Sequence, residues 1–201
     1  MKQTEKTEIT KNKIFAAAIR EFGSKGYEAG AVNNICKTGI NKGLIYHNFK
    51  DKDELYIRCV KKCCRDLIDY IVQNGADNSF IEYMDARMKF FHEFEDEACL
   101  FISALTNPPS HLIKQIKEIY AEFDRLNIAV FEKELSALEL RDTVTEQEAL
   151  NYFVGIQKIY NLSFAAKADG AMSACEQVEL HELNIRRLFD LMLYGIAKGG
   201  N

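Results

Sequence analysis

Apolar residues recur at every third or fourth position along most of this chain, which is the spacing of an amphipathic helix. No stretch keeps the strict alternation of apolar and polar residues that a half-buried strand requires. The two prolines of the chain are adjacent, at Pro108 and Pro109. The pattern therefore predicts an all-α protein. In residues 8–24 the apolar side chains share one helical face: Ile14, Phe15, Ala18, Ile19 and Phe22.

Several helix starts are marked by an acidic or hydroxyl residue followed three positions later by glutamate. In such a capping box each of the two side chains accepts a backbone N–H at the start of the helix. The pairs are Asp51 with Glu54, Ser79 with Glu82, Thr145 with Glu148, and Ser173 with Glu176. Together with Gly23 and Gly26, which we expect to end the first helix, they predict about nine helices: 8–24, 32–38, from 41, 52–73, from 79, 97–105, 110–138, 146–168 and 176–196.

Residues 35–49, with the sequence ICKTGINKGLIYHNF, predict two short helices joined by a turn at Gly39. Asn41 is suited to begin the second helix, because its side chain can accept an unpaired backbone N–H there. Two short helices joined by a glycine turn form a helix-turn-helix, which places its second helix in the major groove of DNA. That helix carries Lys42 and His47, which suit phosphates and base edges better than a core.

Charge is distributed unevenly along the chain, whose overall net charge is −4. Residues 1–60 hold 11 Lys or Arg and 7 Asp or Glu, whereas residues 61–201 hold 15 and 23. A basic head of +4 on an acidic body of −8 fits a phosphate-facing module attached to another domain. No apolar run is long enough to span a membrane, and none follows the N-terminal charges as a leader would. We expect a cytoplasmic protein with no membrane contact.

The six cysteines form no C-x-x-C pair, so reduced thiols are expected. Cys59 and Cys63 share a helix face and would suit a redox sensor, although buried structural thiols are the simpler interpretation. No histidine lies near them in sequence to complete a metal site. No nucleophile–base set, phosphate-binding loop or dinucleotide fingerprint is present. The sequence therefore predicts neither an enzyme nor a metal or cofactor site.

The residues around the helix-turn-helix resemble a known family. The apolar run at 14–18 and the motif together are similar to the N-terminal domain of the TetR (tetracycline-repressor) family of transcription regulators. The resemblance covers the first quarter of the chain, and the rest agrees only in length and helical character. The matching residues are Ala17, Phe22, Gly26, Tyr27, Ile35, Gly39, Lys42, Gly43, Tyr46, His47, Phe49, Lys52 and Leu55.

This resemblance implies which residues face DNA. Lys42 would neutralise a phosphate or reach guanine, and Tyr46 with His47 would clamp phosphates. Lys52, beside the first amides of the next helix, would bind another phosphate. The complete set is Asn41, Lys42, Gly43, Leu44, Tyr46, His47 and Lys52.

Two departures from the family pattern affect this motif. Gly30 and Ala31 stand where the family often has Thr or Ser, so the first motif helix loses a capping hydroxyl and Gly30 would serve as its cap. The segment from Cys36 to Gly39 also looks one residue short, which would end that helix early or change the angle between the two helices.

The resemblance further implies a DNA-binding domain at residues 1–54 and an effector-binding and dimerisation domain at residues 55–201. Methionine and aromatic residues suit an apolar ligand cavity, although core packing would explain each of them individually. The expected lining residues are Leu67, Tyr70, Met84, Met88, Phe91, Phe101, Tyr120, Phe123, Gln157 and Tyr160. The last two helices are apolar on wide faces, and the expected homodimer interface includes Phe153, Ile156, Leu188, Leu191 and Met192.

These observations predict a homodimeric transcriptional regulator, most simply a repressor. It would bind a double-stranded DNA operator and leave it when a small apolar or amphipathic effector binds the body. Two alternatives remain open from the sequence: a helical ligand-binding protein that no longer grips DNA, and a regulator that senses oxidants through Cys59 and Cys63.

Overall fold

The computed structural model describes residues 3–167 and 172–194, and within these ranges the chain is helical with no strand. This confirms the all-α prediction. The helices expected to end at residues 168 and 196 have those ends outside the described residues. The elements are α1 (Gln3–Ala29), α2 (Val32–Cys36), α3 (Lys42–Asn48), α4 (Lys52–Gln73), α5 (Phe80–Glu93), α6 (Glu95–Thr106), the short 3-10 helix η1 (Ser110–Leu112), α7 (Ile113–Ala137), α8 (Glu146–Lys167) and α9 (Ala174–Tyr194).

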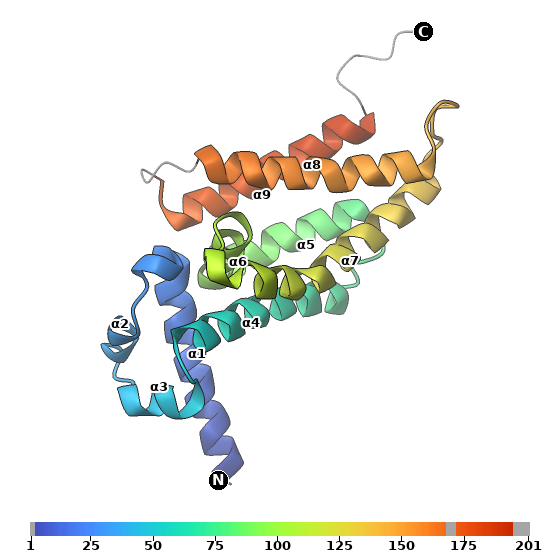
Figure 1. Ribbon diagram of the computed structural model, residues 1–201. Coiled ribbons are helices and arrows are strands. Elements are labelled where there is room, and N and C mark those ends of the chain that lie inside the picture. Colours follow the sequence, from blue (N-terminus) through green and yellow to red (C-terminus); the bar gives the residue numbers. More distant parts are fainter. Residues whose placement is uncertain (1–2, 168–171, 195–201) are drawn as a thin grey trace.

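The helices form a small head and a larger body (Figure 1). Helices α1 to α3 make up the head at one end, and α4 leads from the head into the body. In the body, α5, α6 and α7 lie between α4 on one side and the paired helices α8 and α9 on the other. None of the described helices is both long enough and apolar enough to cross a membrane.

The capping residues expected from the sequence begin their helices as predicted. The Asp51 side chain accepts the Glu54 N–H at 2.8 Å, and the Ser79 hydroxyl accepts the Glu82 N–H. Before α8 and α9, the glutamate of each capping box also reaches back to the backbone N–H of the cap residue, Thr145 or Ser173. Short-range side-chain chemistry therefore sets the starts of these four helices.

The regular turns of the first helix break at Gly26, as expected, but Gly23 does not help to end it. Helix α1 begins earlier, at Gln3, and continues through Gly23 to a bend at Gly26, after which one more turn reaches Ala29. Gly23 lies instead where α1 crosses α6. A Cβ atom at this position would lie 2.8 Å from the Asp96 carbonyl oxygen and 3.2 Å from the Leu100 nitrogen. The absence of a side chain lets the two backbones approach each other.

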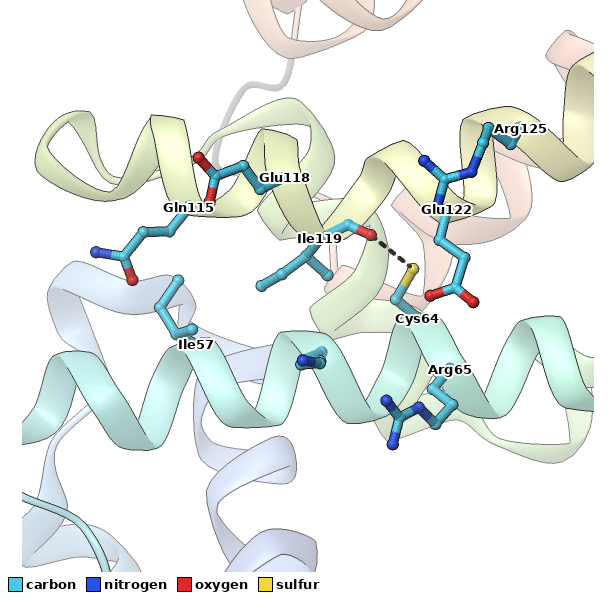
Figure 2. Close-up of a pocket in the computed structure, with 9 residues that line it drawn as sticks. Ile57, Cys64, Arg65, Gln115, Glu118, Ile119, Glu122 and Arg125 are labelled. Atoms are coloured by element: carbon cyan, nitrogen blue, oxygen red, sulfur yellow. Dashed lines mark hydrogen bonds between the residues drawn. The ribbon is translucent and has the colours of Figure 1, made fainter.

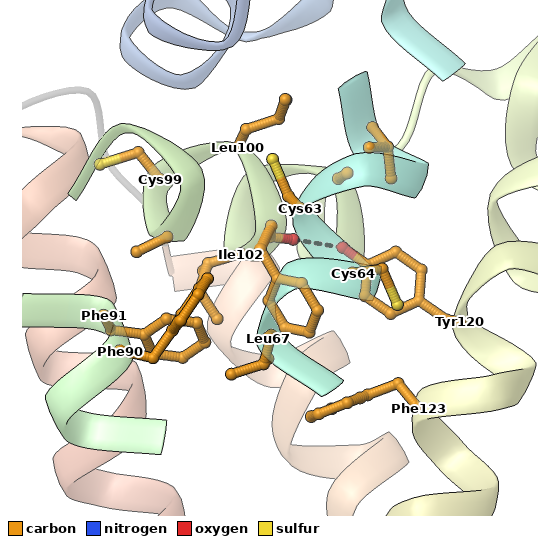
Figure 3. Close-up of a cluster of buried hydrophobic side chains, with 14 of the residues drawn as sticks. Cys63, Cys64, Leu67, Phe90, Phe91, Cys99, Leu100, Ile102, Tyr120 and Phe123 are labelled. Carbon is orange, nitrogen blue, oxygen red and sulfur yellow. Dashed lines mark hydrogen bonds between the residues drawn. The ribbon is translucent and has the colours of Figure 1, made fainter. Parts of the chain in front are cut away.

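A continuous hydrophobic core joins the head to the body. At the junction the rings of Phe22 and Tyr56 pack edge to face, with centroids 5.2 Å apart. Deeper in the body, Figure 3 shows Leu67, Phe91 and Tyr120 from three different helices converging on the same space. The two domains expected from the sequence are thus packed together through one shared core.

Candidate nucleic-acid interface

The turn between α2 and α3 depends on two local features. Gly39 has a φ of +90°, a left-handed conformation that residues with a Cβ atom rarely adopt. After it, the Asn41 side chain accepts the Gly43 N–H at 2.7 Å and so begins α3 as expected. Helix α2 has five residues and ends at Cys36, within the range expected from the sequence but two residues earlier.

Helix α3 turns one face inward and presents the other to solvent. Ile45 and, just beyond the helix, Phe49 are buried and anchor it to the head. The residues expected to contact DNA lie on the other side, where Leu44 is 38% and Tyr46 47% exposed. Also exposed are Asn41, Lys42, Gly43 and His47. The structure therefore brings these six predicted residues together on one accessible surface.

The two lysines of this surface are held in different ways. Lys42 Nζ donates a hydrogen bond to Asn33 Oδ1 of α2 at 3.0 Å, a contact that the sequence did not indicate. Lys52, at the first turn of α4, is half-buried, and its Nζ lies 4.2 Å from the centroid of the Tyr27 ring. Each lysine thus contacts a residue from a different helix of the head, Asn33 of α2 or Tyr27 of α1.

The start of α2 is supported by α1 and not by Gly30. Ala31 is the cap residue and makes no side-chain capping bond. Glu21 on α1 instead accepts the Ala31 N–H at 3.1 Å and the Asn34 side-chain amide at 2.8 Å. Although partial burial opposes ionisation, hydrogen bonds from Asn34, Lys25 and Ala31 hold the pKa of Glu21 below its usual value. A carboxylate distant in sequence replaces part of the role of the missing hydroxyl.

The residues expected to line a ligand cavity lie in and around the core of the body. Leu67, Met84, Phe91, Phe101, Tyr120 and Phe123 are buried, and Tyr70, Met88, Gln157 and Tyr160 are half-buried. Phe101 packs against both Tyr120 and Phe123, with ring centroids 4.9 and 5.1 Å away. The residues on α4 to α7 pack among those four helices, whereas Gln157 and Tyr160 lie on α8, where the Tyr160 hydroxyl donates to the His181 carbonyl oxygen of α9.

A buried polar network, which sequence reasoning missed, crosses this same region. Arg87 of α5 donates from Nε and Nη2 to the two carboxylate oxygens of Glu182 on α9, at 3.0 and 2.6 Å. His181 has one ring nitrogen 3.1 Å from Glu182 and the other 2.8 Å from Asn161 of α8. Burial favours the neutral acid, but Arg87 and His181 outweigh it and lower the pKa of Glu182. The network ties α5 to the last two helices.

An open groove of about 320 Å³ runs between α4 and α7, and Figure 2 shows the residues that line it. Ile57, Cys64 and Ile119 contribute apolar groups to its lining, and Cys64 Sγ lies 3.7 Å from the Ile119 carbonyl oxygen. The other lining side chains are polar or charged. The residues expected to line the ligand cavity are absent from this groove: its lining is Ile57, Lys61, Cys64, Arg65, Gln115, Glu118, Ile119, Glu122 and Arg125.

Helices α8 and α9 expose an unusual number of large apolar side chains in a single subunit. Of the residues expected at a dimer interface, Leu191 is 37% exposed and Ile156, Leu188 and Met192 are half-buried. Phe153 is fully buried and stacks on Phe131 of its own chain at 3.9 Å, so it offers no surface to a partner. Exposed residues outside that expected set are Tyr152, Ile159, Leu162, Leu180, Leu183 and Tyr194.

The helix-turn-helix and its flanking helices match a protein-family model. Residues 14–59 match the model described as bacterial regulatory proteins of the tetR family.

Two curated relatives are negative transcriptional regulators of the HTH type, named IcaR, of the biofilm operon icaADBC. The Staphylococcus epidermidis protein is 28% identical over 116 residues, covering 57% of this chain and 63% of the relative. A Staphylococcus aureus protein is 29% identical over 121 residues, with 58% and 63% coverage. The match thus spans less than two thirds of these relatives' length.

Solved structures show that the whole fold is shared with regulators of this kind. The fatty acid degradation regulator FadR from Bacillus halodurans superposes with a TM-score of 0.63 at 16% identity, over 93% of this chain and 100% of that one. FadR from Bacillus subtilis, in complex with stearoyl-CoA, gives a TM-score of 0.64 at the same identity and coverage. The chain thus carries a helix-turn-helix segment, residues 14–59, that matches the tetR family of bacterial regulatory proteins, on an all-helical body whose fold these regulators share.

Proposed function

We propose that this chain is a DNA-binding transcriptional repressor that acts as a homodimer and responds to a small-molecule effector. The observation that carries the proposal is the outward face of α3, where Lys42, Leu44, Tyr46 and His47 are exposed while Ile45 anchors the helix. Such a helix can enter the major groove, with its lysine neutralising phosphate charge. The negative transcriptional regulators among the relatives support repression in place of activation.

A dimer would present two such helices to two half-sites of the operator. The exposed apolar face of α8 and α9 supports this, because contiguous apolar surface of this kind marks protein interfaces. Leu162 is 73% and Leu183 58% exposed in the single subunit, and burial against a second copy would remove both from water. Two-fold symmetry would then separate the two recognition helices by one or more helical turns of DNA, roughly 34–36 Å for each turn.

The effector would bind the body and change the separation of the heads. We propose an apolar or amphipathic molecule, and the complex of the structural neighbour FadR with stearoyl-CoA supports that chemical class. The aromatic and methionine side chains around Phe101 and Met84 would rearrange to admit it, since Met adapts readily to irregular shapes. The effector would shift DNA affinity only if it bound one head spacing more tightly than the other.

The proposal is tested by an electrophoretic mobility shift with the full-length protein and the DNA upstream of its own gene. The wild type should retard this DNA in the presence of excess unrelated duplex, and Lys42→Ala should retard it less. Lys89→Ala, an equally exposed lysine on α5, serves as the matched control. Failure of the wild type to prefer any segment of that region over unrelated DNA would contradict the assignment as a repressor of neighbouring genes.

The redox alternative gains no support from the thiols. Cys59 and Cys63 are fully buried, and burial raises the pKa of the Cys63 thiol well above its usual value. Cys64 is also buried, and its pKa rises to about 12. Thiols in this state react slowly with oxidants, because the thiolate is the reactive form. Within the described residues, no group of three or more His, Cys, Asp or Glu is arranged to hold a metal ion.

A further inference from the structure

The head meets the body at a three-residue contact centred on Asp53, in the first turn of α4. The Tyr27 hydroxyl, from the end of α1, donates a hydrogen bond to Asp53 Oδ1. His111, from η1 in the body, places Nε2 3.2 Å from Asp53 Oδ2. The Tyr27 and His111 rings also pack edge to face, with centroids 5.3 Å apart. Both carboxylate oxygens of Asp53 are therefore engaged by residues outside α4.

Lys52 is flanked in the sequence by Asp51, Asp53 and Glu54, and each of these carboxylates has another partner. Asp51 accepts the Glu54 N–H, and Glu54 forms an ion pair with Arg58 at 2.6 Å. Asp53 is held by the contact just described. In the described part of the chain, the Lys52 ammonium has no carboxylate oxygen within 4.0 Å and instead lies over an aromatic ring.

This arrangement bears directly on DNA binding. A lysine side chain is flexible and its ammonium pairs with whichever anion is nearest, so a free Asp53 carboxylate would compete with a DNA phosphate for Lys52. The hydrogen bond from Tyr27 is the largest influence that lowers the pKa of Asp53; partial burial opposes it, and His111 and Lys52 add to the lowering. Asp53 thus remains ionised, and Tyr27 and His111 hold its two carboxylate oxygens.

We propose that His111 and Tyr27 are positioning residues for DNA binding: they hold Asp53 so that the Lys52 ammonium stays available for a phosphate. This inference rests on the proposed function, because it assigns a role within the same DNA-binding surface. His111 belongs to the body, so its contact with Asp53 also connects the start of α7 to the head. A displacement of η1 in the body would release the Asp53 carboxylate toward Lys52 and lower the affinity for DNA.

The experiment measures the dissociation constant of the full-length protein for a fluorescein-labelled duplex from the region upstream of its gene, by fluorescence anisotropy. His111→Ala should raise the dissociation constant about two- to five-fold, the range of an exposed ion pair. His111→Gln, whose amide can still donate to Asp53, should restore most of the affinity. His92→Ala changes an exposed histidine on α5 and should behave like the wild type.

A double-mutant analysis separates positioning from a general structural effect. In the backgrounds Lys52→Ala and Asp53→Asn, the further change His111→Ala should have no effect on DNA affinity, because either the lysine or the competing carboxylate is gone. An equal loss in all backgrounds would overturn the proposal, as would wild-type affinity in His111→Ala itself. If the wild type bound no duplex, the proposed function would fail together with this inference, whereas an unaffected His111→Ala protein would refute the inference alone.

Discussion

At the scale of single residues, the buried charges of the body carry the largest energetic consequence. Glu182 is fully buried and holds Arg87 through two hydrogen bonds. Removing one member of such a pair leaves an uncompensated buried charge, which costs about 3–5 kcal/mol. We therefore expect Glu182→Gln to lower the free energy of unfolding by about that amount, as measured by urea denaturation at pH 7. The control is Glu179→Gln, at an exposed position on the same helix, which should change the free energy of unfolding little.

The same residue predicts a dependence on pH. Because the pKa of Glu182 is lower in the folded protein than its ordinary value of 4.5, its ionisation stabilises the fold above that pH. This contribution is lost as the pH falls through the lowered folded pKa. The difference in unfolding free energy between the wild type and Glu182→Gln should therefore narrow in acid below pH 4.5. A difference that stays constant down to the acid unfolding of the wild type would contradict this account.

Lys42 is the residue whose loss should most directly report a phosphate contact. A lysine that neutralises one phosphate releases about one counterion, so Lys42→Ala should reduce the slope of log affinity against log salt by about one. The measurement is a titration of the upstream duplex at several potassium chloride concentrations. Lys89→Ala is the control and should leave the slope unchanged. If Lys42→Ala also left it unchanged, Lys42 would keep its hydrogen bond to Asn33 in the complex and would not contact a phosphate.

At the scale of helices, the crossing of α1 and α6 fixes the head on the body. Gly23→Ala would place a Cβ atom 2.8 Å from a backbone oxygen of α6, which cannot rotate away as a side chain can. The helices must then separate, and overpacking of this kind costs about 1–3 kcal/mol. Thermal unfolding should show a lower midpoint for Gly23→Ala than for Ser24→Ala, the exposed neighbouring position. Equal midpoints would mean that the α6 backbone can move away from the added Cβ atom without a loss of stability.

The apolar face of α8 and α9 makes a second prediction at this scale. Leu162→Lys would place a charge in the proposed dimer interface and should convert the protein to a monomer, as measured by light scattering after size exclusion. Ile81→Lys changes an exposed apolar residue on α5, 58% exposed in the single subunit, and should leave the mass unchanged. If the Leu162→Lys protein remained a dimer, the dimer interface would not include this face of α8 and α9.

Helix starts could be predicted from the sequence because their chemistry is local. Ser79, Thr145 and Ser173 each contact a glutamate or its N–H three positions later, so a four-residue window contains the whole signal. Gly23 was misread as a stop for the opposite reason: the atoms that require glycine belong to α6, more than seventy positions away. A glycine inside a helical pattern does not distinguish a helix end from a close crossing of two helices.

Sequence patterns report local chemistry but not contacts between distant positions, and this explains which part of the functional surface could be predicted. The exposed residues of α3 follow from one short amphipathic helix with a cap and a buried Ile45. The pairing of Arg87 with Glu182 joins positions 95 residues apart, and no periodic pattern relates two charges at that separation. Phe153 was expected at the dimer interface but stacks on Phe131 of its own subunit. An apolar helix face does not reveal which of its residues pack within the subunit and which face a partner.

At the scale of the whole molecule, the two heads of the proposed dimer are tied through α4 to a body held by polar and apolar contacts. Their recognition helices can therefore reach only half-sites on the same face of the DNA. Once footprinting of the upstream DNA has located the two half-sites, inserting about 5 base pairs between them would turn one half-site to the opposite face, and binding should fall to the level of a single half-site. Inserting about 10 base pairs should restore part of it, because the face is recovered while the separation grows. Affinity that declines smoothly with insert length, without regard to helical phase, would mean that the heads move independently, and the body could then not transmit an effector's binding to the operator.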